Sequence, residues 1–306
     1  MKSIQAPQSV VMIRPHHFCS NPDTRDDNAF QTLSNRSADA TSEAALAEFD
    51  QAVIDLRNAG IKVHVFDDHT TKTPDSVFPN NWFSTHAGGH VAIYPMFAQN
   101  RRLERRMDVI EMLKAEYRVQ DVIDYSGLEA DNLALEGTGA MVLDHMGRIA
   151  YTVKSNRADP VILERFCTHF NFEPIAFEAK DAQGRDVYHT NVLMGIGTNY
   201  ALICLDMIVD AERRRTVASR LEESGCEVID LTHDQIGEFA GNAIELTGHK
   251  RRLALSSRAL TSLRPDQLAI IEKSAEPLPL SVPTIETAGG SVRCMIAGIH
   301  LTRRSA

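Results

Sequence analysis

Five polar residues recur at almost equal intervals along this chain of 306 residues. Asn81, Glu136, His189, Asn242 and Cys294 are separated by 55, 53, 53 and 52 residues. Such a period is typical of chains built from repeated supersecondary units, in which each unit buries its apolar face against its neighbours. The spacing therefore predicts equivalent units, and it restricts the possible folds more than any other feature of the chain.

Each interval has the pattern of a strand, a strand, a helix and a strand. The predicted continuous units span residues 81–125, 136–179, 189–232 and 241–285. The fifth unit combines CMIAGIHL (294–301) with VVMIRP (10–15), a helix over 41–60 and a strand over 61–67. We therefore predict an α/β fold: one domain, residues 1–306, forming a five-unit propeller whose ring is closed by its N- and C-terminal segments. Ordinary α/β alternation is the alternative, but it does not place polar residues at matching points of five units.

Composition excludes several classes of protein. The net charge of −9 argues against a nucleic-acid partner, and we interpret the arginine-rich runs 101–106, 213–215 and 250–252 as solvated faces. The N-terminus lacks the apolar region of a signal peptide, and no run approaches the ~20 apolar residues of a membrane span. Five widely spaced cysteines, without a CxxC pair, predict reduced thiols and a cytoplasmic location.

The same scan predicts neither a metal nor a cofactor. The adjacent His16 and His17 lack HxxxH spacing, and no His/Cys group has the separation of zinc ligands. The chain also lacks a phosphate-binding glycine loop.

The periodic positions predict a central cavity, because the first strands of the units would all start near one axis. A thiolate is a competent nucleophile, and Cys294 needs a positive neighbour or dipole to form one at neutral pH. His189 can supply that charge and carry the proton, while Glu136 orients the imidazole. Gly289 and Gly290 let the backbone before the cysteine approach a ligand closely.

Each of these residues also has a purely structural interpretation. Cys294 can be a core residue, as we expect for Cys167, Cys204 and Cys226. His189 can be a hydrogen-bonded strand-start histidine, and Glu136 can flank a turn. The shared period favours the catalytic interpretation of all three residues together.

Four motifs resemble signatures of the guanidine-modifying pentein superfamily, namely LEGTG (135–139), YHTN (188–191), GNA (241–243) and GGSVRC (289–294). That superfamily includes arginine deiminase, dimethylarginine dimethylaminohydrolase, agmatine deiminase and the amidinotransferases. Three further segments are similar to its citrulline utilization hydrolase branch: IRPHHF…NAFQ (13–31), FPNNWFSTH (78–86) and YHTNVLMGIG (188–197). The resemblance covers essentially the whole chain. It implies a five-unit propeller with Cys294 as nucleophile, His189 as general acid/base and Glu136 as its partner.

Departures from the deiminase pattern bear on the substrate. Deiminases hold the guanidinium with carboxylates, whereas the corresponding positions here are Asn80, Asn81 and Asn191. An amide is neutral and pairs with a carbonyl as well as with an NH₂ group. The three amides therefore favour a neutral ureido group, as in citrulline, unless Asn80 and Asn81 merely build a turn after Pro79.

We accordingly predict a cysteine-dependent hydrolase of C–N bonds that converts citrulline to ornithine, ammonia and carbon dioxide. Asn242 joins the substrate-binding set because it shares the periodic phase. Arg14 is the first candidate for the substrate carboxylate and Arg293 the second, since a planar guanidinium binds a carboxylate bidentately. The polar segment 16–36 is either a lid or a plain surface loop.

Two alternatives stay open. One keeps the catalytic residues but acts on a guanidino group, as an arginine, dimethylarginine or agmatine deiminase-type hydrolase or as an amidinotransferase. The other is a non-catalytic propeller that binds a partner, as in a ribosome anti-association factor; that protein lacks the Cys–His–Glu set, which counts against this alternative. The expected partner is a small amino-acid derivative, and an exposed face of the propeller can form a homo-oligomer.

Overall fold

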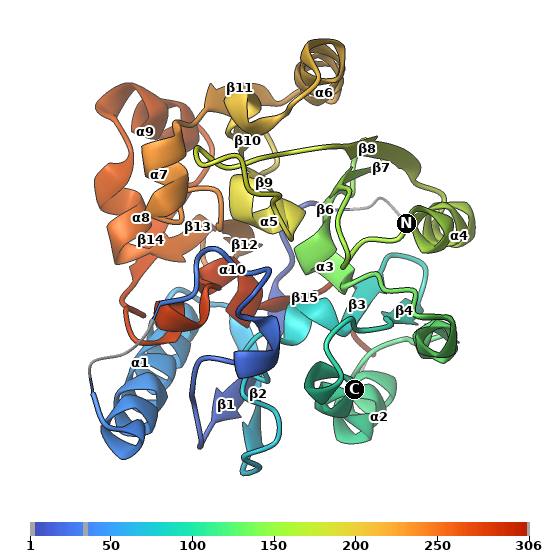
Figure 1. The fold of residues 1–306 in the computed structure, drawn as a ribbon, viewed down its shortest axis with the longest axis vertical. Helices are drawn as coiled ribbons and strands as arrows, with labels where there is room; N and C mark the ends of the chain where they lie inside the picture. Colours follow the sequence, from blue (N-terminus) through green and yellow to red (C-terminus); the bar gives the residue numbers. More distant parts are fainter. Residues whose placement is uncertain (1–3, 33–35, 305–306) are drawn as a thin grey trace.

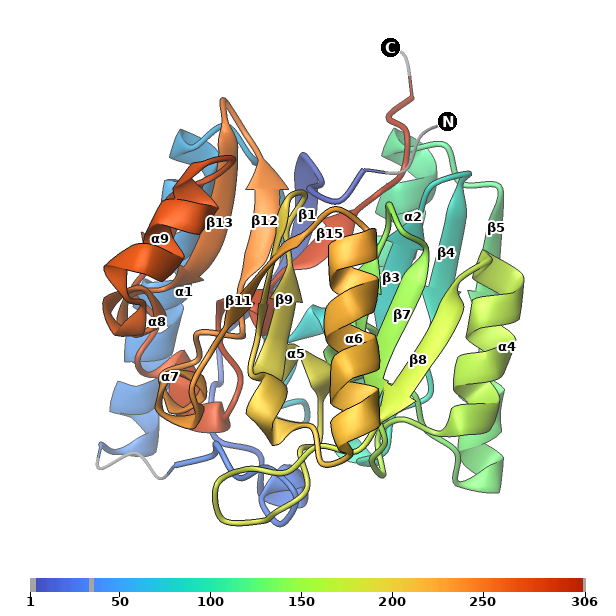
Figure 2. The same cartoon turned by 90° about the horizontal axis from the view of Figure 1, so that it is seen from above.

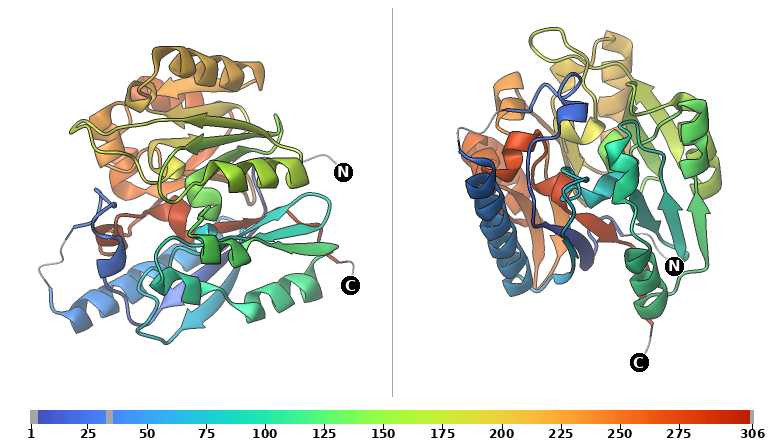
Figure 3. Two further views of the ribbon diagram at one scale, coloured as in Figure 1. Left: turned by 45° about the vertical axis from the view of Figure 1, so that its right-hand side comes forward. Right: turned by 60° about the horizontal axis from the view of Figure 1, so that its bottom comes forward.

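The computed structural model describes residues 4–32 and 36–304, which form five three-stranded sheets around a common centre (Figure 1). The inner strand of each sheet pairs antiparallel with the middle strand, and the middle strand pairs in parallel with the outer strand. A helix connects each middle strand to its outer strand, because parallel neighbours need a crossover connection. These helices cover the outside of the ring (Figure 3).

Four sheets are built from continuous stretches of chain. The first unit contains β3 (Phe83–His86), β4 (His90–Ile93), α2 (Met107–Glu116) and β5 (Asp121–Asp124). The second contains β6 (Met141–Asp144), β7 (Ile149–Val153), α4 (Pro160–Phe170) and β8 (Glu173–Phe177). The third contains β9 (Met194–Ile196), β10 (Tyr200–Ile203), α6 (Ala211–Glu223) and β11 (Glu227–Asp230). The fourth contains β12 (Ile244–Thr247), β13 (Arg251–Ser256), α8 (Ser257–Ser262), α9 (Pro265–Glu272) and β14 (Glu276–Leu280).

The fifth sheet joins the two ends of the chain. It contains β15 (Ala297–Ile299), β1 (Ser9–Pro15), α1 (Ala38–Asn58) and β2 (Lys62–Asp68). β1 runs antiparallel to β15, with Val10 opposite Gly298, and parallel to β2. The C-terminal strand is thus the innermost strand of a sheet whose other members come from the N-terminal part of the chain.

Local sequence explains where the helices begin and end. Asp159 caps α4 by accepting from Val161 and Ile162, and Pro160 supplies a helical φ at its first position. The predicted helix over 101–117 is divided in the structure. A 3₁₀ turn, η3 (Asn100–Glu104), precedes α2, because Arg101 and Glu104 turn inward and pair with each other.

A short helical turn precedes four of the inner strands. These turns are η2 (Pro79–Asn81), α3 (Gly137–Ala140), α5 (Thr190–Leu193) and α10 (Val292–Met295). The expectation that the inner strands start at the periodic residues is therefore wrong by about one helical turn. The turns gather at one end of the ring near α7 (His233–Gly237), while both chain ends lie at the other (Figure 2).

The core lies between the helices and the sheets. Its largest cluster joins the second, third and fourth units and includes Tyr151, Leu202 and Leu255, each fully buried. Within the part of the chain that the structure describes, no helix has the length and apolar character needed to cross a membrane.

Candidate active site

The helical turns bring the five periodic residues together at the centre of the ring. α3 packs against both η2 and α5, and α10 packs against η2. All five side chains, Asn81, Glu136, His189, Asn242 and Cys294, are buried. Close packing requires glycine here: a Cβ on Gly139 would lie 2.0 Å from the side-chain amide of Asn81 and 2.9 Å from the His189 ring.

Glu136 and His189 form the buried hydrogen-bonded pair expected of an acid/base site. The Nε2 atom of His189 lies 2.8 Å from Oε2 of Glu136. The other carboxylate oxygen accepts from the backbone N–H of Phe97 at 3.0 Å. Both carboxylate oxygens are therefore fixed, and the imidazole has one defined orientation.

The electrostatics of this pair favour a neutral imidazole beside an ionised carboxylate. Burial opposes ionisation of Glu136, but Arg157, His189 and Arg101 outweigh it and hold the pKa of Glu136 well below its usual range. Burial lowers the pKa of His189 to about 4, against the opposing effect of Glu136. With Nε2 facing the carboxylate as a donor, the other ring nitrogen of neutral His189 is an acceptor, as a general base requires.

Cys294 lies in α10 with two amide groups directed at its sulfur. The Nδ2 atoms of Asn191 and Asn242 each lie 3.2 Å from Sγ. Asn242 also donates to the backbone carbonyl of Asn191 at 3.0 Å and accepts from the backbone N–H of Arg293 at 3.0 Å. Asn242 thus braces the turn that carries the nucleophile, and Asn191 connects that turn to the turn that follows His189.

The amides of Asn80 and Asn81 have different surroundings. In the orientation that satisfies its neighbours, the Asn81 amide oxygen accepts from Arg101 at 2.8 and 3.1 Å, and its nitrogen donates to Asn80. Nδ2 of Asn80 and Oδ1 of Asn191 are buried and have no hydrogen-bond partner among the described residues. Buried polar atoms normally have partners, so these two atoms are available to a ligand.

Sequence reasoning missed a group of buried charges beside the catalytic pair. Arg101 and Arg157 each expose 2% of their surface, and their Nη1 atoms lie 3.6 and 3.5 Å from Oε2 of Glu136. The interpretation of 101–106 as a solvated face is therefore wrong for Arg101. Asp75 is also buried, its Oδ1 has no partner in the described structure, and burial raises its pKa against the effect of Arg101. Arg101 makes two 2.9 Å hydrogen bonds to Glu104.

Neither arginine chosen for the substrate carboxylate lies in this cluster of charges. Arg14 is half-buried and pairs with Asp50 and Asp67, both at 2.8 Å, on the outer part of the fifth sheet. Arg293 points away from the nucleophile and donates to the backbone carbonyl of Ile296 at 3.0 Å. Strand alternation predicts the same separation of Arg293 from the nucleophile, although Arg293 belongs to a helical turn and not to a strand.

The loop after β1 covers the buried charges. Asn21 donates to Asp75 at 2.8 Å, and Asp27 accepts two hydrogen bonds from Arg157. Asn28 donates to the carbonyl of Ala288, just before the nucleophile turn, at 3.2 Å. The described part of segment 16–36, residues 16–32 and 36, therefore contacts the site as a lid would; residues 33–35 lie outside the described residues.

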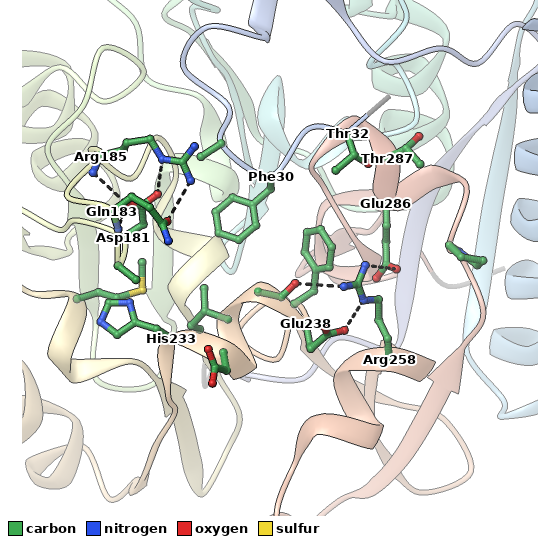
Figure 4. A pocket seen from close by; sticks show the side chains of 18 residues that line it. Phe30, Thr32, Asp181, Gln183, Arg185, His233, Glu238, Arg258, Glu286 and Thr287 are labelled. Carbon is green, nitrogen blue, oxygen red and sulfur yellow. Dashed lines mark hydrogen bonds and ion pairs between the residues drawn. The ribbon is translucent and has the colours of Figure 1, made fainter. Parts of the chain in front are cut away.

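A wide hollow of the described structure lies beside this loop and not at the nucleophile. Its volume is about 710 Å³, and Figure 4 shows its walls. Phe30 and Thr32 of the loop form one side, and Arg258 pairs with Glu238 at 2.6 Å on another. Its lining includes four carboxylates, a histidine and two arginines: Asp181, Asp234, Glu238, Glu286, His233, Arg185 and Arg258. The hollow is therefore acidic and adjoins the cover of the site.

One group of the described residues has the geometry of a metal site, and it lies elsewhere. His16, Asp67 and His69 offer ligand atoms within 4.8 Å of one another at the ends of β1 and β2. Arg14 donates to the same Asp67 oxygen, and its positive charge opposes a cation there. This group makes no contact with the catalytic pair.

Comparisons with known proteins agree with the sequence motifs. A family model described as N,N dimethylarginine dimethylhydrolase, eukaryotic, matches residues 14–301. No curated protein matches the chain.

Solved structures of similar fold include ArgZ and AgrE. The N-terminal domain of ArgZ, described as an arginine dihydrolase from the ornithine-ammonia cycle in cyanobacteria, superposes with a TM-score of 0.72 at 16% identity, over 96% of this chain and 99% of that one. AgrE, solved with ornithine and NAD+, gives 0.72 at 17% identity over 97% of this chain, which spans only 40% of AgrE. A dimethylarginine dimethylaminohydrolase adduct gives 0.65 at 12% identity, over 97% of this chain and 100% of that one.

Proposed function

Since the chain belongs to the N,N-dimethylarginine dimethylhydrolase family of the pentein superfamily, whose members hydrolyse C–N bonds through a covalent cysteine, we propose that it hydrolyses the guanidino group of a free, arginine-like amino acid. This is the guanidino alternative of the sequence analysis. ArgZ and the dimethylarginine enzyme support it, since both act on arginine-type compounds.

The observation that carries the proposal is the balance of buried charge. Three buried carboxylates, Asp75, Glu104 and Glu136, surround only two buried arginines, Arg101 and Arg157. Burial raises the pKa of Asp75 and raises that of Glu104 to about 7, so a cation bound among these residues would stabilise their ionised forms, whereas a neutral group would not. The acidic hollow beside the loop supports the same substrate, because it raises the local concentration of cations near the cover of the site.

Two residues of this buried cluster can bind the α-carboxylate and the α-amino group of an amino-acid substrate. Arg157 holds the carboxylate of Asp27 with two hydrogen bonds, the fork geometry that binds any carboxylate. Asp75 offers an unpaired oxygen to an ammonium group. Arg157 for the α-carboxylate and Asp75 for the α-amino group replace Arg14 and Arg293 as our assignment.

The reaction then follows from the geometry. His189 takes the proton of the Cys294 thiol, and the resulting thiolate attacks the guanidino carbon. The imidazolium returns that proton to the departing nitrogen, the C–N bond breaks and an amine leaves, while the new C–S bond joins enzyme and substrate. Neutral His189 next removes a proton from water, the hydroxide adds to the same carbon, and the sulfur leaves as thiolate. The product carries a ureido group, and Glu136 stabilises the imidazolium form of His189 in both halves.

Hydrolysis of a ureido group is the second candidate function, favoured by the amides. The free Nδ2 of Asn80 can donate to a ureido carbonyl, and the free Oδ1 of Asn191 can accept from a ureido NH₂. Attack by Cys294 on citrulline would release ammonia, and hydrolysis of the resulting thiocarbamate would give ornithine and carbon dioxide.

A substrate panel distinguishes the two candidates. Purified protein is incubated with L-arginine, dimethylarginine, L-citrulline and agmatine, and the amines, citrulline and ornithine are quantified. We expect turnover of L-arginine or dimethylarginine. The rate with agmatine should be at least about tenfold lower, because agmatine lacks the carboxylate that Arg157 would bind. Cys294→Ala should be inactive and Cys204→Ala active. Ornithine from citrulline alone would favour the second candidate, and no turnover by folded protein would contradict both.

A further inference from the structure

A second set of cavities lies on the axis behind the nucleophile. Two chambers of about 40 and 30 Å³ share six lining residues: Thr138, Leu143, His145, Ile244, Arg293 and His300. A wider hollow of about 550 Å³ shares His145 and His300 with both chambers. Its lining includes Ile4 and Arg303, so it lies at the end of the ring where the chain termini emerge (Figure 2). The three cavities thus share lining residues from the terminal end of the ring inward to Arg293, the residue before Cys294.

This path has the opposite charge from the hollow beside the loop. Among the described residues that line its three cavities there is no carboxylate, although the chain carries a net charge of −9. Its titratable groups are cationic or basic side chains and one phenol: Lys62, Arg293, Arg303, His145, His300 and Tyr117. A small anion entering from the terminal end therefore meets no negative side chain on the path.

Arg293 is the innermost cation and has no counter-ion in the described structure. Its guanidinium donates to the carbonyl of Ile296, and no described carboxylate lies within ion-pair distance of it. Burial lowers the pKa of Arg293 to about 10, and the neighbouring Cys294 opposes this lowering. A half-buried cation without a carboxylate partner would be stabilised by an anion in the chambers.

His145 and His300 stand between the wide hollow and the chambers. Their rings stack with centroids 3.8 Å apart, and Gln5 fixes the first of them by accepting from its backbone N–H at 2.9 Å. Burial lowers the pKa of both, to about 4 for His300, with further lowering by Arg293. Both rings are therefore neutral at pH 7 and each has one N–H donor. The His300 donor faces the backbone of Ile4, so His145 is the ring whose N–H can serve a ligand.

We propose that the two chambers together are a binding site for one small oxyanion of the size of bicarbonate or nitrate, held by Arg293 and by the ring N–H of His145, which His300 positions by stacking. A planar oxyanion matches the fork of a guanidinium, and the shared lining lets one anion use the space of both chambers. The proposal does not depend on the substrate, because Glu136, His189 and Cys294 do not line the chambers.

The test is anion-dependent stability of the substrate-free protein. Thermal unfolding is followed while sodium bicarbonate or sodium nitrate replaces sodium gluconate at constant ionic strength, since gluconate is too large for the chambers. We expect saturable stabilisation of the wild-type protein. Stabilisation by bicarbonate alone would identify the anion as hydrated carbon dioxide, and equal effects of both anions would identify a general site for small oxyanions.

Variants locate the effect. Arg293→Met should raise the apparent Kd about tenfold or more, because it removes a charge-assisted pair of hydrogen bonds. His300→Asn, farther from the nucleophile, should weaken binding less and serves if Arg293→Met does not fold. Lys62→Met, in the wide hollow and already paired with Glu116, is the control and should leave Kd unchanged. Equal stabilisation of wild type, Arg293→Met and His300→Asn would overturn the proposal.

Discussion

The thiol of Cys294 differs from the other thiols of the chain in its surroundings. Burial raises the pKa of Cys167 and Cys226 to about 12 and of Cys204 to about 11. Burial and Asp75 also raise the pKa of Cys19. Only Cys294 receives two side-chain amide N–H groups on its sulfur among the described residues. Its thiolate is therefore the one best supported by its neighbours.

This difference predicts selective alkylation. Iodoacetamide at neutral pH should label Cys294 at least about tenfold faster than the other four cysteines, because the thiolate is the reactive form. Peptide mapping over time measures the order of labelling. Removing the amide in Asn191→Ala should slow the labelling of Cys294, whereas equal rates for Cys294 and Cys204 would contradict an activated nucleophile.

The buried imidazole of His189 predicts a dependence of stability on pH. Its folded pKa, about 4, lies below the ordinary 6.5, so the unfolded chain binds the proton first as the pH falls. Stability should therefore fall between pH 6.5 and pH 4, by about 3 kcal/mol at most from this group. Urea unfolding of wild type and His189→Gln at pH 7 and pH 5 should show a smaller pH effect in the variant. The exposed His17→Gln is the control, and an equal pH effect in all three proteins would be inconsistent with a buried neutral His189.

At the scale of elements, the loop after β1 is bound to the site through few contacts. Its strongest contact is Asp27 on Arg157, and Arg157 in turn lies beside Glu136. Phe18 anchors the start of the loop in the core and Phe30 packs against Phe239, but the other contacts are mainly polar. A segment held by an ion pair and hydrogen bonds opens at lower cost than a packed element. In the proposed function, the substrate carboxylate takes the place of Asp27 on Arg157.

Asp27→Asn tests the role of this contact. The variant should loosen the loop, speed the labelling of Cys294 several-fold and increase cleavage by proteases within residues 22–32, because a neutral amide pairs more weakly with a buried arginine. The neighbouring Asp26→Asn, an exposed position without a described side-chain contact, is the matched control. Unchanged labelling and cleavage in Asp27→Asn would show that the loop is held by other contacts.

Some helices, strands and site residues could be predicted from the sequence, and others could not. The repeat and the strand–helix pattern predicted five units, because each unit repeats the same alternation of apolar segments. The helical turns before the inner strands were missed, since four residues are too few for a helical period. Arg101 was taken as solvated because it begins an arginine run, and its burial depends on Glu104 and on contacts from other units. Asp75 and Arg157 do not belong to the set of five regularly spaced residues, so no sequence pattern predicted that they lie at the site.

At the scale of the whole molecule, neighbouring units meet through their backbones near the centre of the ring. A Cβ on Gly241 would lie 2.6 Å from the carbonyl oxygen of Val192, and a Cβ on Gly195 would lie 2.8 Å from that of Ala243. These contacts join the turns that carry Asn191 and Asn242. The precision of the site therefore depends on how closely adjacent units pack.

Gly241→Ala should consequently reduce both stability and activity. An added methyl group at this contact forces the two units apart and costs about 1–3 kcal/mol. Gly127→Ala is the control, because a Cβ there meets no atom within 4 Å. Denaturant unfolding and steady-state kinetics measure both effects, and a Gly241→Ala protein that matches Gly127→Ala in both would contradict this view of the unit contacts.

The most direct test of the whole account is to trap the covalent intermediate. Protein mixed with arginine labelled with ¹³C in the guanidino carbon is quenched in acid during turnover, and its peptides are analysed by mass spectrometry. The account predicts a labelled substrate adduct on the peptide that contains Cys294, absent from Cys294→Ser and present in Cys204→Ser. Turnover of arginine without any adduct on Cys294, or an adduct on a different cysteine, would contradict it.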